Sequence, residues 1–186
     1  LRPDAQVPDD VRTYARLQRL RAGTPPTNYL GSPAISAALM RTEDRLYACE
    51  VDHDAHARLV SNVAGPENVR PLRCDGWTQA PTGPGVSVVL CDPPYAERGE
   101  WSLAAEHAAA WRSAGHIVLL WYPIKGASRP AALLNDLQTQ TQHGTVAELW
   151  TAPGDTSRNR LNGSGLVLLG EVPEFAARAA AAAAWL

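Results

Sequence analysis

The stretch Val86-Ser-Val-Val-Leu-Cys-Asp-Pro-Pro-Tyr95 decides which fold we expect for this chain. Its first part, Val86 to Cys91, is a nearly all-apolar run of strand length, which is typical of a parallel strand covered on both faces. We therefore expect this strand to be central in a sheet. Because Pro93 and Pro94 disfavour helical backbone at the residues before them, the chain should stay extended beyond the end of the strand.

The segment after this strand is predicted to form a rigid ledge of hydrogen-bond acceptors. Neither proline has an N–H, so the Asp92 carboxylate and the Pro93 carbonyl would stand side by side, with the Tyr95 ring two residues further on. Two acceptors suit the two hydrogens of an exocyclic amino group on a planar ring, and Tyr95 could stack on the face of that ring. A Pro-Pro turn that only closes the strand is the alternative, and the apolar strand before it favours the functional interpretation.

Outward from this segment, strand-like and helical stretches alternate along the chain. We expect further strands at 45–51, 68–74, 116–122, 146–151 and 165–169, and helices at 10–21, 34–41, 53–63, 101–113, 127–140 and 173–186. Ser32 is predicted as the N-cap of the second helix, and the third helix is predicted to bury Ala57, Val60 and Ala64. The alternation indicates an α/β fold with an open, mostly parallel sheet, in which ligands bind beyond the carboxyl ends of the strands.

Three successive strands of this pattern end in a cysteine followed by an acid. The pairs are Cys49-Glu50, Cys74-Asp75 and Cys91-Asp92. Because the carboxyl ends of parallel strands meet at one edge, we expect the three carboxylates to lie on the same edge, and this favours a functional site there. Each of Glu50 and Asp75 taken alone could equally cap the segment that follows it, since carboxylates stabilise helix N-termini.

Length and composition exclude several classes of protein. The 186 residues are 45% hydrophobic and 19% charged, which fits one compact domain with a core. No apolar run reaches the ~18 residues that a membrane span needs, and Leu1 to Asp10 contain no apolar core of a secretory signal. No C-x-x-C spacing links Cys49, Cys74 and Cys91, so we expect neither a disulfide framework nor a zinc site. We expect the protein to lie in a reducing cytoplasm.

The charges of the chain say little about a nucleic-acid partner. A net charge of −2 gives no overall attraction to RNA or DNA, so contact would depend on a local patch. Arg158 and Arg160, in the polar loop before the last strand, are candidates for phosphate contacts, although a solvated loop explains them equally well. His53 and His56 have helical spacing but no third ligand at a suitable spacing, so we predict no metal.

Taken together, these motifs resemble a known family. Asp92-Pro-Pro-Tyr95 is similar to the signature of S-adenosylmethionine-dependent methyltransferases that act on exocyclic amino groups, chiefly adenine N6. From about Val11 onward the chain resembles the bacterial 23S ribosomal RNA adenine-N6 methyltransferases of the RlmJ type. The segments that carry this resemblance, in chain order, are Tyr29–Pro33, Asp44–Glu50, Asp75-Gly76, Leu120–Pro123 and Asn162–Gly165.

The resemblance implies a Rossmann-like class I methyltransferase fold and S-adenosylmethionine as cofactor. Ser32 and Glu50 match positions that bind the cofactor, with Glu50 suited to its ribose hydroxyls. Asp75 and Gly76 match the pair beside its adenine. The catalytic residues implied are Asp92, Pro93 and Tyr95, and the predicted substrate contacts are Pro94, Tyr95, Arg158 and Arg160.

The family's first strand and glycine-rich cofactor loop are not found in this sequence. The G-x-G triplets at 83–85 and 163–165 do not follow a strand and open a helix, so neither matches that loop. We accordingly expect 1–28 to be a remnant of a helical insertion with a linker, 29–186 to be the methyltransferase core, and this chain alone to bind the cofactor weakly or not at all.

The function expected from the resemblance is methyl transfer to the N6 of an adenine in 23S ribosomal RNA, by a cytoplasmic monomer with no membrane partner. Two alternatives stay open. One is a cofactor-free nucleic-acid-binding remnant that keeps only the base pocket, and the other is a DNA adenine methyltransferase.

Overall fold

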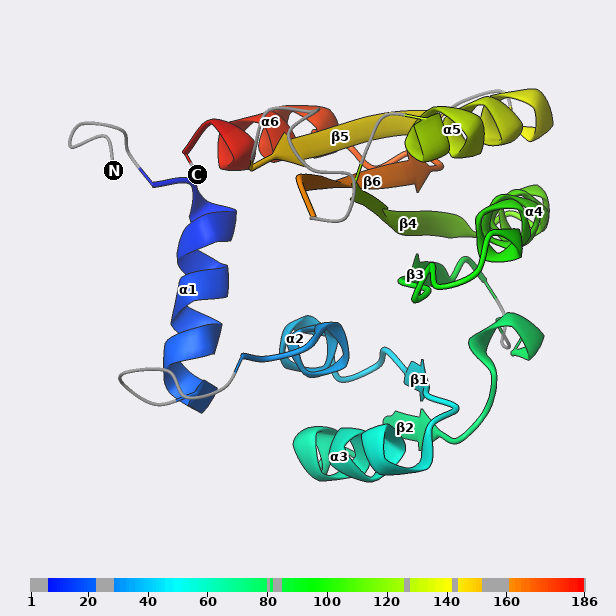
Figure 1. The fold of residues 1–186 in the computed structure, drawn as a ribbon. Helices are drawn as coiled ribbons and strands as arrows, with labels where there is room; N and C mark the ends of the chain where they lie inside the picture. Colours follow the sequence, from blue (N-terminus) through cyan, green and yellow to red (C-terminus); the bar gives the residue numbers. More distant parts are fainter. Residues whose placement is uncertain are drawn as a thin grey trace. The chain divides into compact units, whose positions relative to one another are not determined.

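The structure is a computed structural model that describes residues 7–22, 29–79, 81, 85–125, 128–141, 144–151 and 161–185. The chain folds as two compact units, Arg2–Ala80 and Pro81–Leu186, and each is described by itself below. Figure 1 labels the helices and strands of both. No helix within the described ranges is long and apolar enough to cross a membrane.

The first unit contains two short parallel strands that a helix connects. β1 and β2 run parallel, with the end of β1 at Cys49 opposite Leu72, and α3 is the crossover between them and packs on β2. The elements in chain order are α1 (Asp9–Ala22), α2 (Ser32–Leu39), β1 (Leu46–Cys49), α3 (His53–Val63), β2 (Val69–Leu72) and the 3-10 turn η1 (Gly76–Thr78).

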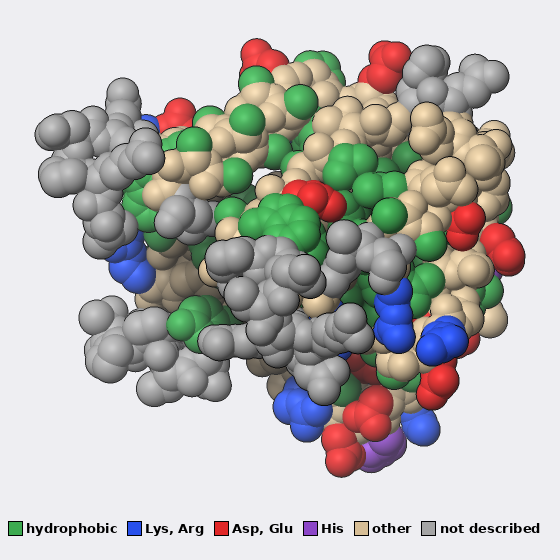
Figure 2. All heavy atoms as spheres, turned by 45° about the horizontal axis from the view of Figure 1, so that its top comes forward, with side chains coloured by type: hydrophobic (Ala, Val, Ile, Leu, Met, Phe, Trp, Pro, Cys, Tyr) green, Lys and Arg blue, Asp and Glu red, His purple; other side chains and the backbone are tan. Residues whose placement is uncertain are grey.

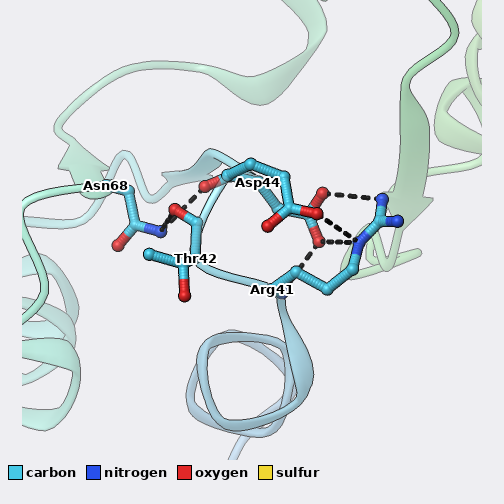
Figure 3. A network of polar contacts seen from close by, with 5 residues as sticks. Arg41, Thr42, Asp44 and Asn68 are labelled. Carbon is cyan, nitrogen blue, oxygen red and sulfur yellow. Dashed lines mark hydrogen bonds and ion pairs between the residues drawn. The ribbon is translucent and has the colours of Figure 1, made fainter.

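A polar network braces the amino-terminal edge of this strand pair (Figure 3). The Asp44 carboxylate accepts hydrogen bonds from the Arg41 backbone N–H at 2.9 Å and from its guanidinium at 3.0 and 3.2 Å, and these contacts lower the pKa of Asp44. Asn68 Nδ2, just before β2, donates to the carbonyl oxygens of Thr42 and Asp44 at 3.2 and 2.8 Å. The two loops that lead into β1 and β2 are thereby tied together at the edge opposite the strand ends.

The second unit is a four-stranded mixed sheet with helices. The strand order is β3-β4-β6-β5, in which β3 and β4 are parallel and β6 runs antiparallel to both of its neighbours. Its elements are β3 (Val88–Cys91), α4 (Gly99–Ser113), β4 (Ile117–Ile124), α5 (Ser128–Gln140), β5 (Gly144–Trp150), β6 (Gly163–Leu169) and α6 (Phe175–Trp185). The observed class is the predicted α/β fold with flanking helices.

The core of the second unit lies between its sheet and the helices α4 and α5, which pack side by side (Figure 1). Alanines let α4 approach closely, and Ala104, Ala105 and Ala108 are fully buried. They meet the buried face of β4, where Val118 and Leu120 are also inaccessible to solvent. This packing fixes β4 and, through it, the end of β3.

β3 differs from the sequence expectation. Among the described strands it pairs with β4 alone, so it lies at an edge of its sheet and the predicted central position is wrong for this sheet. Val88 and Leu90, on one face, are 65% and 46% exposed, whereas Cys91 is buried. An all-apolar run predicts a strand correctly, but it carries no information about which strands lie beside it.

Two predicted details of the first unit are also wrong. Gly31, not Ser32, is the N-cap of α2, and Ser32 is its first residue. In α3 the buried residue is Val63, whereas Ala57 and Ala64 are exposed and Val60 is 41% exposed. The inward face of α3 is therefore shifted by one residue toward the amino terminus relative to the prediction, since Val63 is buried in place of Ala64.

Candidate active site

The ledge after β3 is neither helical nor part of a strand, which agrees with the helix-breaking effect expected of its prolines. Burial alternates along it, since Pro93 and Tyr95 are buried while Asp92 and Pro94 reach solvent. The segment 92–96 belongs to no helix or strand. Asp92 and Pro94 are therefore presented outward at the carboxyl edge of the β3–β4 pair.

Tyr95 locks this ledge onto β4. Its backbone has a φ of 51°, a left-handed conformation that costs a non-glycine residue roughly 1–2 kcal/mol. Its hydroxyl donates to the Trp121 carbonyl oxygen at 2.8 Å, and its ring centroid lies 4.4 Å from that of Trp101 and 6.3 Å from that of Trp121. The side chain is only 4% exposed, and burial raises its pKa. In this geometry the ring anchors the chain, and neighbouring atoms cover the faces on which a base would stack.

Asp92 is a carboxylate without a local partner. None of the described residues donates a hydrogen bond to it or pairs with it as an ion. The surrounding atoms remove part of its water, and this desolvation raises the pKa of the Asp92 carboxyl above its ordinary value. An exposed acceptor with nothing bound to it is available to a ligand.

The acids of the first unit lie at one edge but are engaged locally. Glu50 directly follows β1, and its Oε1 accepts from the Asp52 N–H at 2.9 Å. Asp75, beyond β2, accepts through Oδ1 from the Trp77 N–H at 2.9 Å and is the N-cap of η1. Asp75 thus caps the segment after it, whereas the N-cap of α3 is Asp52 and Glu50 accepts from the N–H of that residue. The second oxygen of Glu50 and that of Asp75 have no partner among the described residues.

Gly76 brings the chain after β2 against the end of β1. A Cβ placed on Gly76 would stand 3.6 Å from the Cβ of Cys49, so the two segments are in van der Waals contact. The Cys49 thiol lies beside Cys74, and burial, followed by the contact with Cys74, raises its pKa to about 12. The Cys49 thiol is therefore neutral at physiological pH, near the cofactor residues that we predicted.

The predicted site residues fall into two groups. Ser32, Glu50, Asp75 and Gly76 belong to the first unit, and the residues from Asp92 to Tyr95 belong to the second. Arg158 and Arg160 lie outside the described residues. Within the part of the chain that the structure describes, no three His, Cys, Asp or Glu side chains gather as a metal site would require.

Sequence reasoning missed the aromatic support of the ledge. Trp101, at the start of α4, is only 9% exposed, and Trp121 supplies both the carbonyl that Tyr95 binds and a second ring beside it. A signal was present, because each tryptophan lies close to an end of a predicted element that flanks the ledge. The pattern of apolar residues could not show that both converge on Tyr95.

Comparisons with known proteins agree with the fold and identify a family. The model of the family described as "Ribosomal RNA large subunit methyltransferase D, RlmJ" matches residues 1–186. A crystal structure of the protein LPL1258 from Legionella pneumophila superposes with a TM-score of 0.87 at 18% identity, covering 97% of this chain and 69% of that one. At this identity the superposition shows the shared fold.

Two curated relatives carry the description "Ribosomal RNA large subunit methyltransferase J". The one from Haemophilus influenzae is 27% identical over 173 residues, which is 88% of this chain and 61% of the relative. The one from Escherichia coli K12 is 28% identical over 148 residues, which is 76% of this chain and 52% of the relative. The chain therefore spans between half and two thirds of the length of these relatives.

Proposed function

The chain belongs to the family of ribosomal RNA large subunit methyltransferase D, RlmJ, and on this premise we propose that it transfers a methyl group from S-adenosylmethionine to the N6 of an adenine in 23S ribosomal RNA. One observation carries the proposal within this chain. Asp92 follows a strand at its carboxyl end, is exposed, has no partner among the described residues and lies three residues before Tyr95, whose hydroxyl anchors this segment to β4.

The chemistry assigned to the ledge follows from the electronic structure of adenine. The amino lone pair is delocalised into the ring, which makes the nitrogen a poor nucleophile. Hydrogen bonds from its two hydrogens to the Asp92 carboxylate and the Pro93 carbonyl would localise that lone pair and fix the direction of attack. As the nitrogen–carbon bond forms and the carbon–sulfur bond breaks, the positive nitrogen sits beside the Asp92 charge, and one amino proton then leaves.

The first unit offers groups that fit the adenosine half of the cofactor. S-adenosylmethionine, when bound, supplies the methyl group as part of a sulfonium. Glu50 and Asp75 each use one carboxylate oxygen to accept a backbone N–H and leave the other for a ligand, which fits ribose hydroxyls for Glu50 and the adenine amino group for Asp75. Gly76 gives close access beside the end of β1, and we propose Ser32 as a further contact.

We propose the contacts with the RNA substrate from the exposure of the side chains and from their positions in the chain. Pro94 is exposed next to Asp92, which suits contact with the base. Arg158 and Arg160 are proposed phosphate contacts. The base-stacking role predicted for Tyr95 stays a prediction, and its burial and its hydrogen bond to Trp121 support a role in holding Asp92 and Pro93 in place.

We further propose the division into 1–28 and the methyltransferase core 29–186, a monomeric state and a location in the cytoplasm. The division of the chain at residue 28 differs from the two compact units, which meet at residue 80. Gln18 Oε1 accepts from the Leu30 N–H at 2.9 Å, so α1 is tied to the chain beyond the proposed boundary.

The test is methyl transfer from labelled S-adenosylmethionine to unmethylated 23S ribosomal RNA, followed by nuclease digestion and identification of the modified nucleoside. We expect N6-methyladenosine with the wild type and a large loss with Asp92→Asn. Labelled DNA of mixed sequence is the matched substrate, and preferential labelling of DNA would favour the DNA adenine methyltransferase. RNA binding without methyl transfer, even at a large excess of S-adenosylmethionine that offsets weak cofactor binding, would contradict the proposal and favour a binding remnant.

A further inference from the structure

The start of β6, Asn162-Gly-Ser-Gly165, has no role in the site described so far, yet both of its glycines are required by their neighbours. A Cβ on Gly165 would overlap the ring of Tyr122, which crosses over β6 at this point. A Cβ on Gly163 would overlap the Leu149 carbonyl and stand 3.1 Å from the Cα of Trp150. The two glycines therefore make room for an aromatic ring from β4 and for the close approach of β5.

That room lets a buried residue orient an exposed one. Tyr122, Gly165 and Glu148 lie opposite one another in adjacent strands, and the fully buried Tyr122 donates its hydroxyl hydrogen to Glu148 Oε1 at 2.6 Å. The other oxygen, Oε2, accepts from the Trp150 indole N–H at 3.0 Å. The Trp150 side chain is nevertheless 43% exposed. A carboxylate that uses both oxygens in this way fixes the plane of an aromatic ring that solvent can reach.

Trp150 also lies on the edge that carries Asp92. β5 is antiparallel to β6, which is antiparallel to β4, so β5 ends at the same edge as β3 and β4. In the order β3-β4-β6-β5, three strand spacings, about 14 Å, separate β5 from β3 across the sheet. The register also places Trp150 level with Ile124, four residues or about 13 Å beyond the level of Cys91 and Leu120, so the two strand ends are about 20 Å apart. A few nucleotides of single-stranded RNA span such a distance.

On the face of the molecule that Figure 2 shows, charge gives RNA little to bind among the described residues. On the face shown in Figure 2, the basic side chains of described residues stand singly or beside acidic ones, with apolar side chains between them. The net charge of the chain is −2. Stacking of bases on exposed aromatic rings is the principal alternative to phosphate contacts for unpaired RNA.

We propose that Trp150 is a stacking platform for an unpaired base of the RNA substrate, a few nucleotides from the target adenine, and that Glu148 and Tyr122 are the residues that position it. The proposal rests on the proposed function, because it takes RNA as the substrate. It gives the Asn162–Gly165 segment a purpose, which is to let Tyr122 reach Glu148 across β6.

The experiment measures binding and stacking separately. A 12-nucleotide single-stranded RNA carrying 2-aminopurine at varied positions reports stacking by quenching of its fluorescence, and anisotropy of an end-labelled copy gives the Kd. We expect Trp150→Ala to raise the Kd about tenfold, within the range measured for loss of base–aromatic stacking, and to abolish the quenching at one position. Trp150→Phe should keep most of the affinity, and Glu148→Gln should weaken the quenching while the melting temperature stays near that of the wild type.

Val146→Ala is the matched control, because Val146 lies on the same face of β5 and is 46% exposed. It should bind RNA like the wild type, and a duplex of the same sequence should bind wild type and Trp150→Ala equally. Unchanged Kd and quenching in Trp150→Ala, or an equal loss in Val146→Ala, would overturn the platform.

The methylation assay separates this outcome from failure of the proposed function. At saturating RNA, Trp150→Ala should keep the maximal transfer rate and raise only KM, whereas Asp92→Asn should lose the rate and keep the Kd. A wild type that transfers methyl groups to RNA while Trp150→Ala binds normally refutes the platform alone. A wild type that binds no RNA refutes both.

Discussion

The acidic residues that follow β1 and β2 differ from the one that follows β3 in the hydrogen bonds that their carboxylate oxygens accept. Glu50 and Asp75 each accept a backbone N–H two residues further along the chain, at 2.9 Å in both cases. Asp92 accepts nothing from the described residues, and two prolines replace the N–H donors that would otherwise follow it. The same position at a strand end therefore serves local structure in the first unit, whereas in the second it holds a carboxylate without a partner among the described residues.

This difference predicts which substitutions should lower stability and which should lower activity. A side chain that caps a turn contributes to the free energy of unfolding, typically about 1 kcal/mol. A carboxylate with no partner contributes little to folding, and partial desolvation raises its pKa at a small cost to stability. Substitution of Asp75 should thus lower stability, whereas substitution of Asp92 should not, and the following predictions test this contrast in order of expected size.

The largest effect is expected at Asp92. Asp92→Ala should lower the methylation rate by ~100-fold or more, the scale of losing one preorganised electrostatic contact. Asp92→Asn should also lower it, because its amide is neutral and its nitrogen can only donate. Cofactor affinity and melting temperature should change little. Near-normal transfer to 23S ribosomal RNA by the alanine variant would remove Asp92 from the mechanism, and a large fall in melting temperature would make it a structural cap like Asp75.

The next effect concerns pH. Burial raises the pKa of Asp92 in the folded chain, so the folded state binds this proton more tightly than the unfolded state does. Lowering the pH through that raised pKa should therefore not cost stability at this group, but it removes the carboxylate that the reaction needs. We expect the rate to fall about tenfold per pH unit on an acidic limb placed above the ordinary aspartate range. A limb that persists unchanged in Asp92→Asn would assign it to another group.

A smaller effect on the methylation rate is expected when the anchoring of the ledge is weakened and the Asp92 charge is kept. Tyr95→Phe keeps the ring between Trp101 and Trp121 but loses the hydrogen bond to the Trp121 carbonyl. We expect a three- to tenfold lower maximal rate with KM for RNA nearly unchanged, because misplacement of a positioned group affects the transition state most. A raised KM with an unchanged maximal rate would instead support the stacking role of Tyr95.

The sequence was sufficient to predict features that depend on adjacent residues. The apolar run before Asp92 predicted a strand, and Pro93 and Pro94 predicted that no helix follows it directly, because proline restricts the residue before it. The alternation of helices and strands likewise predicted the α/β class. The cap at Asp75 was one of two interpretations that the sequence allowed, whereas the N-cap of α3 is Asp52 rather than Glu50.

Features that depend on distant pairing could not be predicted in this way. β3 lies at the edge of the described sheet because of which strands pair, and hydrophobicity does not encode this. The hydrogen bond of Tyr95 joins residues 26 positions apart, and so does that of Tyr122 with Glu148. The sequence shows Gly165 only as part of a G-x-G triplet, and the strand register is needed to show that it makes room for the Tyr122 ring.

The smallest effect is expected at Asp75, and it sharpens the contrast with Asp92. Asp75→Ala removes the acceptor of the Trp77 N–H at the start of η1, which should lower the free energy of unfolding by about 1 kcal/mol. For a chain of this size that corresponds to a fall of about 2–4 °C in Tm. Asp75→Asn keeps an oxygen in the same place and should cost much less. Asp92→Ala is the matched control, since it removes an equal side chain at a strand end with no described partner. If Asp75→Ala and Asp92→Ala lowered Tm equally, the distinction between a capping and a free carboxylate would fail.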